Sequence, residues 1–169
     1  MEYFIGVALL GVLFWIWLRR PRKMVIQTII DGDTFMAADR KGKVRKLRLA
    51  GVDCPEIGQP GGKEARDFTF HRLHRRWVRV RLLGRDRYRR YLCRVQTRDG
   101  DFCRILVAEG WAHPLPGRFA PVLKTLSWSA RVQGKGVFGL PGRVAPWRWR
   151  RSFRLWRWLW RASHYQKRR

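Results

Sequence analysis

Short apolar runs separated by turn residues dominate the first half of the chain after residue 23. The runs are rich in Val, Ile and Leu, several alternate with polar positions, and turns containing Gly, Asp or Pro divide them. They predict strands at residues 24–30, 34–38, 44–52, 77–84 and 91–97. The first three strands are joined by short turns, so we expect a meander of the kind that begins a small barrel.

Three further segments predict helices. Residues 63–76 have acidic side chains near the start and arginines at the end, which complements the helix dipole. Residues 102–110 and 120–133 each run to a glycine stop. With no internal repeat, five strands and three helices predict an α+β fold, a five-stranded OB-type β-barrel with helices packed outside it.

Residues 3–18 carry no charge, in contrast to the strongly charged sequence that follows them. As a helix they would span ~24 Å, and two tryptophans and four basic residues at their C-terminal side suit a membrane interface. The basic residues follow the run, the reverse of a signal peptide, and no small-residue cleavage site is present. We interpret the run as a transmembrane helix that anchors a single-pass protein, rather than a signal peptide or a buried core helix. The basic flank favours the cytoplasmic side for the remainder, with the outside as the alternative.

The chain is strongly basic. Its 169 residues include 38 Lys and Arg against 12 Asp and Glu, a net charge of +26. This charge attracts polyanions, so nucleic acid or anionic lipid is the expected partner class. The hydrophobic fraction of 46% is enough for a packed core and excludes a disordered chain. Three cysteines without a CxxC pair argue against both a disulfide-stapled mini-protein and a zinc module.

The charge pattern divides the chain into three parts. Residues 1–23 form the predicted anchor and its basic flank, and residues 24–140, with 24 basic and 11 acidic residues, form the folded domain. Residues 141–169 hold 10 basic and no acidic residues, together with five tryptophans. On a helical wheel, residues 147–161 place an aromatic stripe beside an arginine stripe, which predicts an interfacial membrane helix. Nucleic-acid binding and a solvated, disordered tail are the alternatives.

The acidic residues of the domain stand at informative places. Asp31, Asp33, Asp53 and Glu56 all lie at turns or strand ends. Side-by-side strands can bring two such ends together, and a hard cation such as Ca²⁺ requires several oxygen ligands. The simpler alternative is that the aspartates only terminate strands and form turns.

The order of several motifs decides between these alternatives. Together the motifs closely resemble the staphylococcal nuclease (thermonuclease) family, over roughly residues 24–139. They are DGDTF (31–35), RLAGVDCPE (48–56), EAR (64–66), RDRYRRYL (85–92), LVAEGWA (106–112) and SARVQGKGVFG (129–139). The family's fold is an OB-type barrel with three helices, which agrees with the elements predicted above.

The resemblance implies a calcium site. Asp33 and Asp53 correspond to the two calcium-ligating aspartates of the family. Cys54 replaces the family's usual Thr, but that position ligates through its main-chain carbonyl, so the ligand is retained. Asp31 is expected to stabilise the ligating aspartates without binding the cation itself.

The resemblance also assigns the catalytic groups. Glu56 corresponds to the carboxylate that activates the attacking water, and Arg48 and Arg90 to the arginines that hold the scissile phosphate. Tyr88 is a candidate for stacking on a base or nucleoside, with Tyr91 as a second candidate and structural packing as the alternative for both. The family usually has Tyr-Gly-Arg where this chain has Tyr88-Arg89-Arg90. If the backbone is left-handed at this position, Arg89 in place of glycine would lower the free energy of unfolding by ~1 kcal/mol or more.

The sequence therefore predicts a membrane-anchored, Ca²⁺-dependent endonuclease that hydrolyses phosphodiester bonds in DNA, with RNA left open as a further substrate. All five functional positions carry compatible side chains. The alternatives are a non-catalytic OB-type module that tethers nucleic acid to a membrane, and a membrane-associated scaffold whose charge serves lipid.

Overall fold

The computed structural model describes residues 20–117 and 119–152 of the chain. The predicted anchor at residues 3–18 lies outside this part, as do residues 153–161 of the predicted interfacial helix. Within the described residues, no helix has the length and apolar character needed to cross a membrane.

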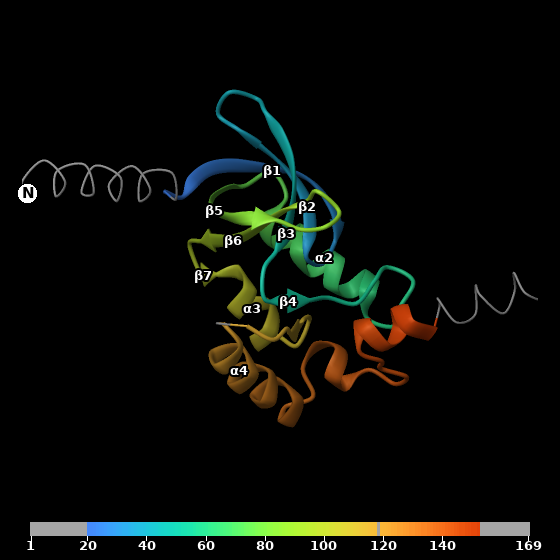
Figure 1. Ribbon diagram of the computed structural model, residues 1–169. Coiled ribbons are helices and arrows are strands. Elements are labelled where there is room, and N and C mark those ends of the chain that lie inside the picture. Colours follow the sequence, from blue (N-terminus) through green and yellow to red (C-terminus); the bar gives the residue numbers. More distant parts are fainter. Residues whose placement is uncertain (1–19, 118, 153–169) are drawn as a thin grey trace, which may run out of the picture.

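Five long strands of the described chain close into a barrel (Figure 1). They are β1 (Arg22–Asp31), β2 (Thr34–Asp39), β3 (Val44–Leu49), β5 (Trp77–Arg85) and β6 (Tyr91–Thr97). Neighbours pair antiparallel in the order β3-β2-β1-β5-β6, and a parallel pairing of β3 with β6 closes the cylinder. The predicted five-stranded barrel is confirmed.

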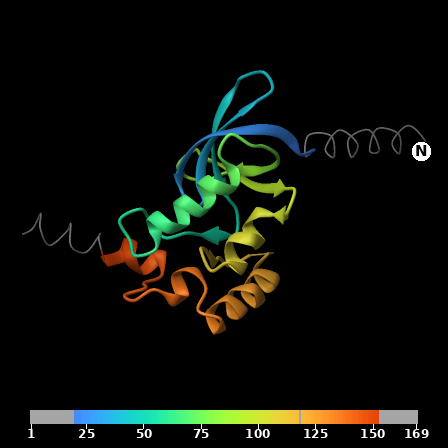
Figure 2. The same ribbon diagram turned by 180° about the vertical axis from the view of Figure 1, so that it is seen from behind.

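The three predicted helices form at one end of this barrel (Figures 1 and 2). They are α2 (Gly62–Leu73), α3 (Phe102–Ala108) and α4 (Ala120–Val132), followed by the short 3₁₀ helix η1 (Gly136–Gly139). Three further strands have only two residues each: β4 (Val52–Asp53), β7 (Gly100–Asp101) and β8 (His113–Pro114). In Figure 2, α2 crosses in front of the barrel, and α4 is the helix farthest from it.

Two predicted boundaries were wrong. The strand expected at residues 44–52 ends at Leu49, because Gly51 has a φ of +82°, and Val52–Asp53 then pairs with β8 instead. The helix expected at residues 63–76 ends at Leu73. Arg75, with a φ of +57°, turns the chain so that its amide donates to the Ile26 carbonyl.

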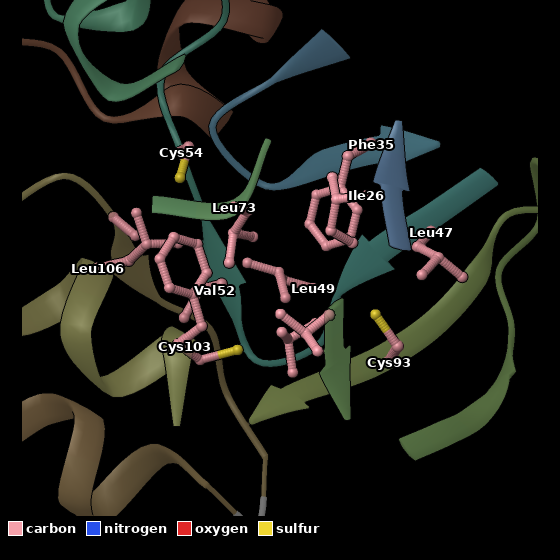
Figure 3. Close-up of a cluster of buried hydrophobic side chains, with 14 of the residues drawn as sticks. Ile26, Phe35, Leu47, Leu49, Val52, Cys54, Leu73, Cys93, Cys103 and Leu106 are labelled. Atoms are coloured by element: carbon pink, nitrogen blue, oxygen red, sulfur yellow. The ribbon is translucent and has the colours of Figure 1, made fainter. Parts of the chain in front are cut away.

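One hydrophobic core joins the barrel to the helices (Figure 3). Phe35 and Leu47 enter it from the barrel strands, and Phe102 and Leu106 enter it from α3. All three cysteines, Cys54, Cys93 and Cys103, are buried in this core and free. Burial raises the pKa of each thiol, that of Cys103 to about 12, so these side chains are neutral packing groups. The fold thereby fixes the ends of β1, β3 and β4 relative to one another.

Candidate functional site

The turn between β1 and β2 is pressed against the end of β4. A Cβ atom on Gly32 would lie 2.8 Å from the Cβ of Cys54 and 3.2 Å from that of Ala65, so only glycine fits. The Thr69 hydroxyl of α2 donates to the Gly32 carbonyl at 2.7 Å. This packing brings Asp33, which follows Gly32, close to Asp53, which precedes Cys54.

Arg48 links the two aspartates. Its Nη1 donates to Oδ1 of Asp33, and its Nη2 donates to Oδ1 of Asp53 at 2.7 Å. Both carboxylates are fully buried, with exposed fractions of 0% and 1%, and burying a carboxylate costs free energy unless it is paired. The structure therefore brings Asp33, Asp53 and Arg48 into one hydrogen-bonded group, as predicted from the order of motifs.

Backbone and hydroxyl donors complete the surroundings of Asp33. The amide of Cys54 donates to Asp33 Oδ2 at 2.8 Å, and the Thr34 hydroxyl donates to Asp33 Oδ1 at 3.0 Å. The main chain of Cys54 thus lies at the carboxylate, where a carbonyl ligand was expected. Its side chain points into the core (Figure 3).

Arg48 owes its place to the closure of the barrel. It stands opposite Thr34 on β2 and opposite Leu92 on β6. The side chain is 14% exposed, so one part of the guanidinium holds the aspartates while the group still reaches solvent. An arginine on a central, doubly paired strand is a rigid feature of the site.

Glu56 lies on the loop that follows β4. Its carbonyl accepts from the amide of Gln59 at 2.8 Å, and a Cβ on Gly62 would overlap that same carbonyl oxygen. The loop can therefore close only because α2 begins with glycine. The Glu56 side chain is 43% exposed, so its carboxylate stands at the solvent edge of the site.

A residue that the sequence analysis did not single out enters the same group. Arg150 donates to Asp53 Oδ2 at 2.6 Å, to Asp53 Oδ1 at 3.2 Å and to Glu56 Oε1 at 2.8 Å. It lies in a helical turn at residues 146–152 that packs beside the loop after β4 (Figures 1 and 2). Arg150 belongs to a tail with 10 basic residues, and the helical wheel places it on the arginine stripe without marking it as a partner of Asp53.

Arg90 is held at the edge of this group by a partner of its own. Its Nε donates to Asp86 Oδ2 at 2.7 Å, and its amide donates to Oδ1 at 3.0 Å. Desolvation of Asp86 opposes ionisation, but the hydrogen bonds from Arg90 lower the pKa of Asp86 overall. No hydrogen bond joins the Arg90 guanidinium to Asp33, Asp53 or Glu56. Arg90 ends the turn that leads into β6, two residues before the partner of Arg48.

Asp31 lies behind Asp33 and interacts with both arginines. Its Oδ1 accepts from the amide of Asp33 at 3.2 Å. Burial raises the pKa of the Asp31 carboxyl, and Arg48, a hydrogen bond from Thr34 and the charge of Arg90 oppose that rise. The charge of Arg90 therefore acts on Asp31, although its hydrogen-bonded partner is Asp86.

The two candidate stacking residues differ in their availability. Tyr88 is 64% exposed, and the guanidiniums of Arg87 and Arg90 lie 4.9 and 5.2 Å from its ring centre. Tyr91 is half-buried, its hydroxyl accepts from Arg85, and that guanidinium lies 4.3 Å from its ring centre. Both rings therefore have arginine contacts, and Tyr88 is the more exposed of the two.

The donor atoms agree in type with a hard divalent cation. Asp33 and Asp53 supply buried carboxylate oxygens that converge on one guanidinium, and hard cations prefer oxygen ligands. Among the described residues, no group of three or more His, Cys, Asp and Glu side chains is arranged to hold a metal. The expected ligands include only two such side chains, those of Asp33 and Asp53. The third expected ligand is the main-chain carbonyl oxygen of Cys54.

Comparison with known proteins agrees with this fold and site. The family model of staphylococcal nuclease homologues matches residues 46–137. A protein of Escherichia coli O157:H7 described as an uncharacterized endonuclease is 34% identical over 125 residues, which are 72% of this chain and 80% of that protein. A micrococcal nuclease of Shigella flexneri is 33% identical over 136 residues, covering 73% and 78% of the two chains.

A third relative covers a shorter segment. The thermonuclease of Staphylococcus hyicus is 41% identical over 92 residues, which are 50% of this chain and 54% of that protein. A closed five-stranded barrel with buried aspartates and arginines at its strand ends defines the class of protein. The chain belongs to the staphylococcal nuclease family.

Proposed function

We propose that this protein is a Ca²⁺-dependent endonuclease that hydrolyses phosphodiester bonds in DNA, with RNA as a further candidate substrate. The observation that carries the proposal is the joining of Asp33 and Asp53 through Arg48 at the end of the barrel. Family membership supports the reaction class.

Asp33, Asp53 and the main-chain carbonyl of Cys54 are the groups that would hold the cation. When bound, the cation supplies Lewis-acid stabilisation of the charge that develops on the phosphate. The buried position of both aspartates keeps them fixed and excludes most of the competing water.

Arg48 and Arg90 bind the scissile phosphate in this proposal. A guanidinium offers two parallel donors to two phosphate oxygens and stays charged at every physiological pH. Arg48 reaches the site from a rigid strand, and Asp86 orients Arg90 through two hydrogen bonds. Tyr88, with its exposed ring, is placed to stack on a neighbouring base.

Glu56 orients and deprotonates the attacking water. A general base must be accessible to water and within hydrogen-bond reach of it, and the half-exposed Glu56 carboxylate at the edge of the site meets the first condition. Transfer of the water proton to Glu56 makes the oxygen nucleophilic toward phosphorus, and the leaving oxygen departs on the opposite side.

The alternative remains a non-catalytic OB-type module that binds nucleic acid at the same surface. We favour the enzyme because a binding module needs basic residues only. It has no use for two buried aspartates, whose desolvation costs free energy, or for a carboxylate at the solvent edge.

The two functions separate in one assay. We expect the full-length chain, kept in mild detergent because of its uncharged run, to degrade plasmid and single-stranded DNA with Ca²⁺ and not with chelator. If the enzyme is correct, Glu56→Gln and Arg90→Ala each slow degradation on the order of a hundredfold or more. DNA binding that weakens steeply with salt, without cleavage in any condition, would support the binding module instead.

We further propose that residues 3–18 attach the protein to a membrane, with the barrel end nearest residue 20 facing the bilayer. Lys23, Arg40, Trp77, Arg79 and Arg98 line a hollow at that end, and the Trp77 ring is 57% exposed. Basic side chains and an exposed indole suit anionic head groups. The length of β1, ten residues at ~3.3 Å each, separates this end from Asp31 by ~30 Å, which leaves the site open to nucleic acid.

A reporter joined after Arg169 tests the orientation. Reporter activity on the cytoplasmic side agrees with the basic flank of the anchor, and activity on the outer side would establish the alternative orientation. Recovery of the full-length chain in the soluble fraction, without detergent, would remove the membrane proposal altogether.

The position of the tail bears on whether it binds nucleic acid or a membrane. Its described beginning, at residues 146–152, lies beside Glu56 and on the opposite side of the molecule from residue 20 (Figures 1 and 2). That position favours the nucleic-acid alternative for residues 147–161 over the membrane surface. We therefore propose that the tail contacts the substrate near the site.

A further inference from the structure

Arg150 reaches the candidate metal ligands from outside the segment that the family model matches. That segment is residues 46–137, and Arg150 is separated from Glu56 by 94 positions. The arginine nevertheless makes three hydrogen bonds to the two carboxylates, at 2.6, 2.8 and 3.2 Å. Those bonds, the one to Asp53 above all, raise the pKa of Arg150, so it is a permanent cation.

Together with Arg48, this cation occupies both oxygens of Asp53. Oδ2 accepts from Arg150, and Oδ1 accepts from Arg48 at 2.7 Å and from Arg150 at 3.2 Å. These three hydrogen bonds take most of the roughly four lone-pair positions of the carboxylate, so a divalent cation bound to Asp53 would share the carboxylate with two guanidiniums. It would also stand within a few Å of the Arg150 charge, where repulsion in a partly buried site is strong. The guanidinium and a divalent ion therefore compete for the same carboxylate.

Of the two arginines on Asp53, Arg150 is the more exposed and the one that lies outside the barrel. Arg48 lies on a strand paired on both sides, and its side chain is 14% exposed. The Arg150 side chain is 43% exposed and extends from a helical turn outside the barrel.

Several contacts outside the barrel dock the segment that carries Arg150. The Gln59 side chain donates to the carbonyl of Val144, and the ring of Trp147 meets the ring of His113 edge-on at 5.5 Å. These contacts and the buried side chain of Pro146 hold the segment beside the carboxylates. The segment supplies no strand of the barrel, so it can undock while the barrel stays paired.

We infer that Arg150 is an internal cation that fills the metal site of the free protein, and that metal binding expels it together with residues 144–152. This inference rests on the proposed function, because it takes Asp53 as a metal ligand. Linkage makes the coupling reciprocal: the segment weakens metal binding by the same factor by which the metal weakens docking of the segment. Expulsion also frees a guanidinium at the rim of the site.

Calcium affinity measured by titration calorimetry tests the inference without reference to activity. The full-length chain in detergent is titrated with CaCl₂ as wild type, Arg150→Ala and Arg151→Ala. Arg151 is an exposed neighbour, so its replacement removes the same charge from the same helix. We expect Arg150→Ala to lower the Kd for Ca²⁺ about tenfold and Arg151→Ala to change it less than twofold. An unchanged or higher Kd in Arg150→Ala would overturn the inference.

A second variant tests whether the effect travels through docking. Trp147→Ala keeps Arg150 and every carboxylate and removes the ring that contacts His113. It too is expected to lower the Kd for Ca²⁺. In the wild type, Ca²⁺ should speed amide exchange at residues 146–152 and leave exchange in β3 unchanged. Exchange that slows at residues 146–152 would show that the metal tightens the segment, contrary to the inference.

Asp33→Ala separates this inference from the function on which it rests. Ca²⁺ binding that needs Asp33 but is insensitive to Arg150→Ala refutes the inference alone. Binding that survives Asp33→Ala unchanged, or no binding in the wild type and Arg150→Ala alike, refutes the proposed metal site and the inference with it.

Discussion

Gly32 and Cys54 touch across the site: a Cβ on the glycine would lie 2.8 Å from the Cβ and 2.9 Å from the Sγ of the cysteine. This contact joins the turn after β1 to the end of β4. Each partner is flanked by a candidate metal ligand, Asp33 on one side and Asp53 on the other. The separation of the two carboxylates therefore depends on the absence of a single side chain.

Gly32→Ala should push the two ligands apart. We expect a loss of about 1–3 kcal/mol in the free energy of unfolding, typical of overpacking, together with a weaker affinity for Ca²⁺. Denaturant unfolding and calcium titration measure the two effects. Gly58→Ala is the matched control, because a Cβ at Gly58 meets nothing within 4 Å. Equal behaviour of the two variants would contradict the role assigned to the contact.

Arg89 adopts the left-handed conformation that the family's glycine allows, with a φ of +63°. Arg89→Gly is therefore expected to raise the free energy of unfolding by about 0.5–1 kcal/mol. Arg89→Ala removes the same charge but keeps the Cβ atom, so it should bring no such gain. A thermal or denaturant midpoint that rises equally in both variants would point to charge and not to backbone strain.

Asp86 is a positioning residue for Arg90. Asp86→Asn weakens the charged hydrogen bond that orients the guanidinium, now 2.7 Å long, so we expect about tenfold slower DNA cleavage. Arg90→Ala should cost more, on the order of a hundredfold. Asp99→Asn, at an exposed residue paired loosely with Arg72 at 3.6 Å, provides the control. Normal cleavage by Asp86→Asn would remove Asp86 from the site.

His113 makes the fold sensitive to acid. It pairs with Asp53 across β4 and β8, its side chain is buried, and its Nδ1 has no hydrogen-bond partner within residues 20–117 and 119–152. Burial and the charge of Arg131, opposed by Asp53, lower the pKa of His113 from 6.5 to about 4. Between those values the unfolded chain binds a proton that the folded chain does not, so stability falls as the pH drops from about 6.5 to 4.

The acid sensitivity can be assigned by substitution. The lowered pKa of His113 corresponds to a loss of about 3 kcal/mol in the free energy of unfolding between pH 6.5 and 4. His113→Gln should remove this part of the pH dependence. The measurement is made with chelator, so that metal binding does not contribute. His71→Gln, at an exposed histidine, should leave the pH dependence as it is in the wild type. An identical slope in wild type and His113→Gln would contradict the assignment.

The long elements of the fold could be predicted from the sequence because each carries its own pattern. β1, β5 and β6 are marked by β-branched runs, and α4 by apolar spacing. The two-residue strands β4 and β8 have no period to detect and exist only because Val52–Asp53 and His113–Pro114 meet in the folded chain. The end of β3 depends on the left-handed conformation of Gly51. A glycine can adopt this conformation, but its presence in the sequence does not show that it does.

The site divides in the same way. Asp33, Asp53, Arg48 and Glu56 were predicted together because they stand in local motifs whose order is specific. Arg150 could not be predicted, since its partners lie 94 and 97 positions away and its own neighbours are arginines too. A long-range ion pair of this kind depends on how the tail packs against the loop after β4.

The rate of DNA cleavage by Asp33→Asn across a full range of Ca²⁺ concentrations tests the central claim most directly. Asp33 is buried, is joined to Asp53 through Arg48, and is replaced by a side chain of nearly the same shape. We predict that the wild type becomes active as Ca²⁺ is added and that no Ca²⁺ concentration restores the variant. Cleavage by the wild type in chelator, or wild-type cleavage by the variant, would contradict the account.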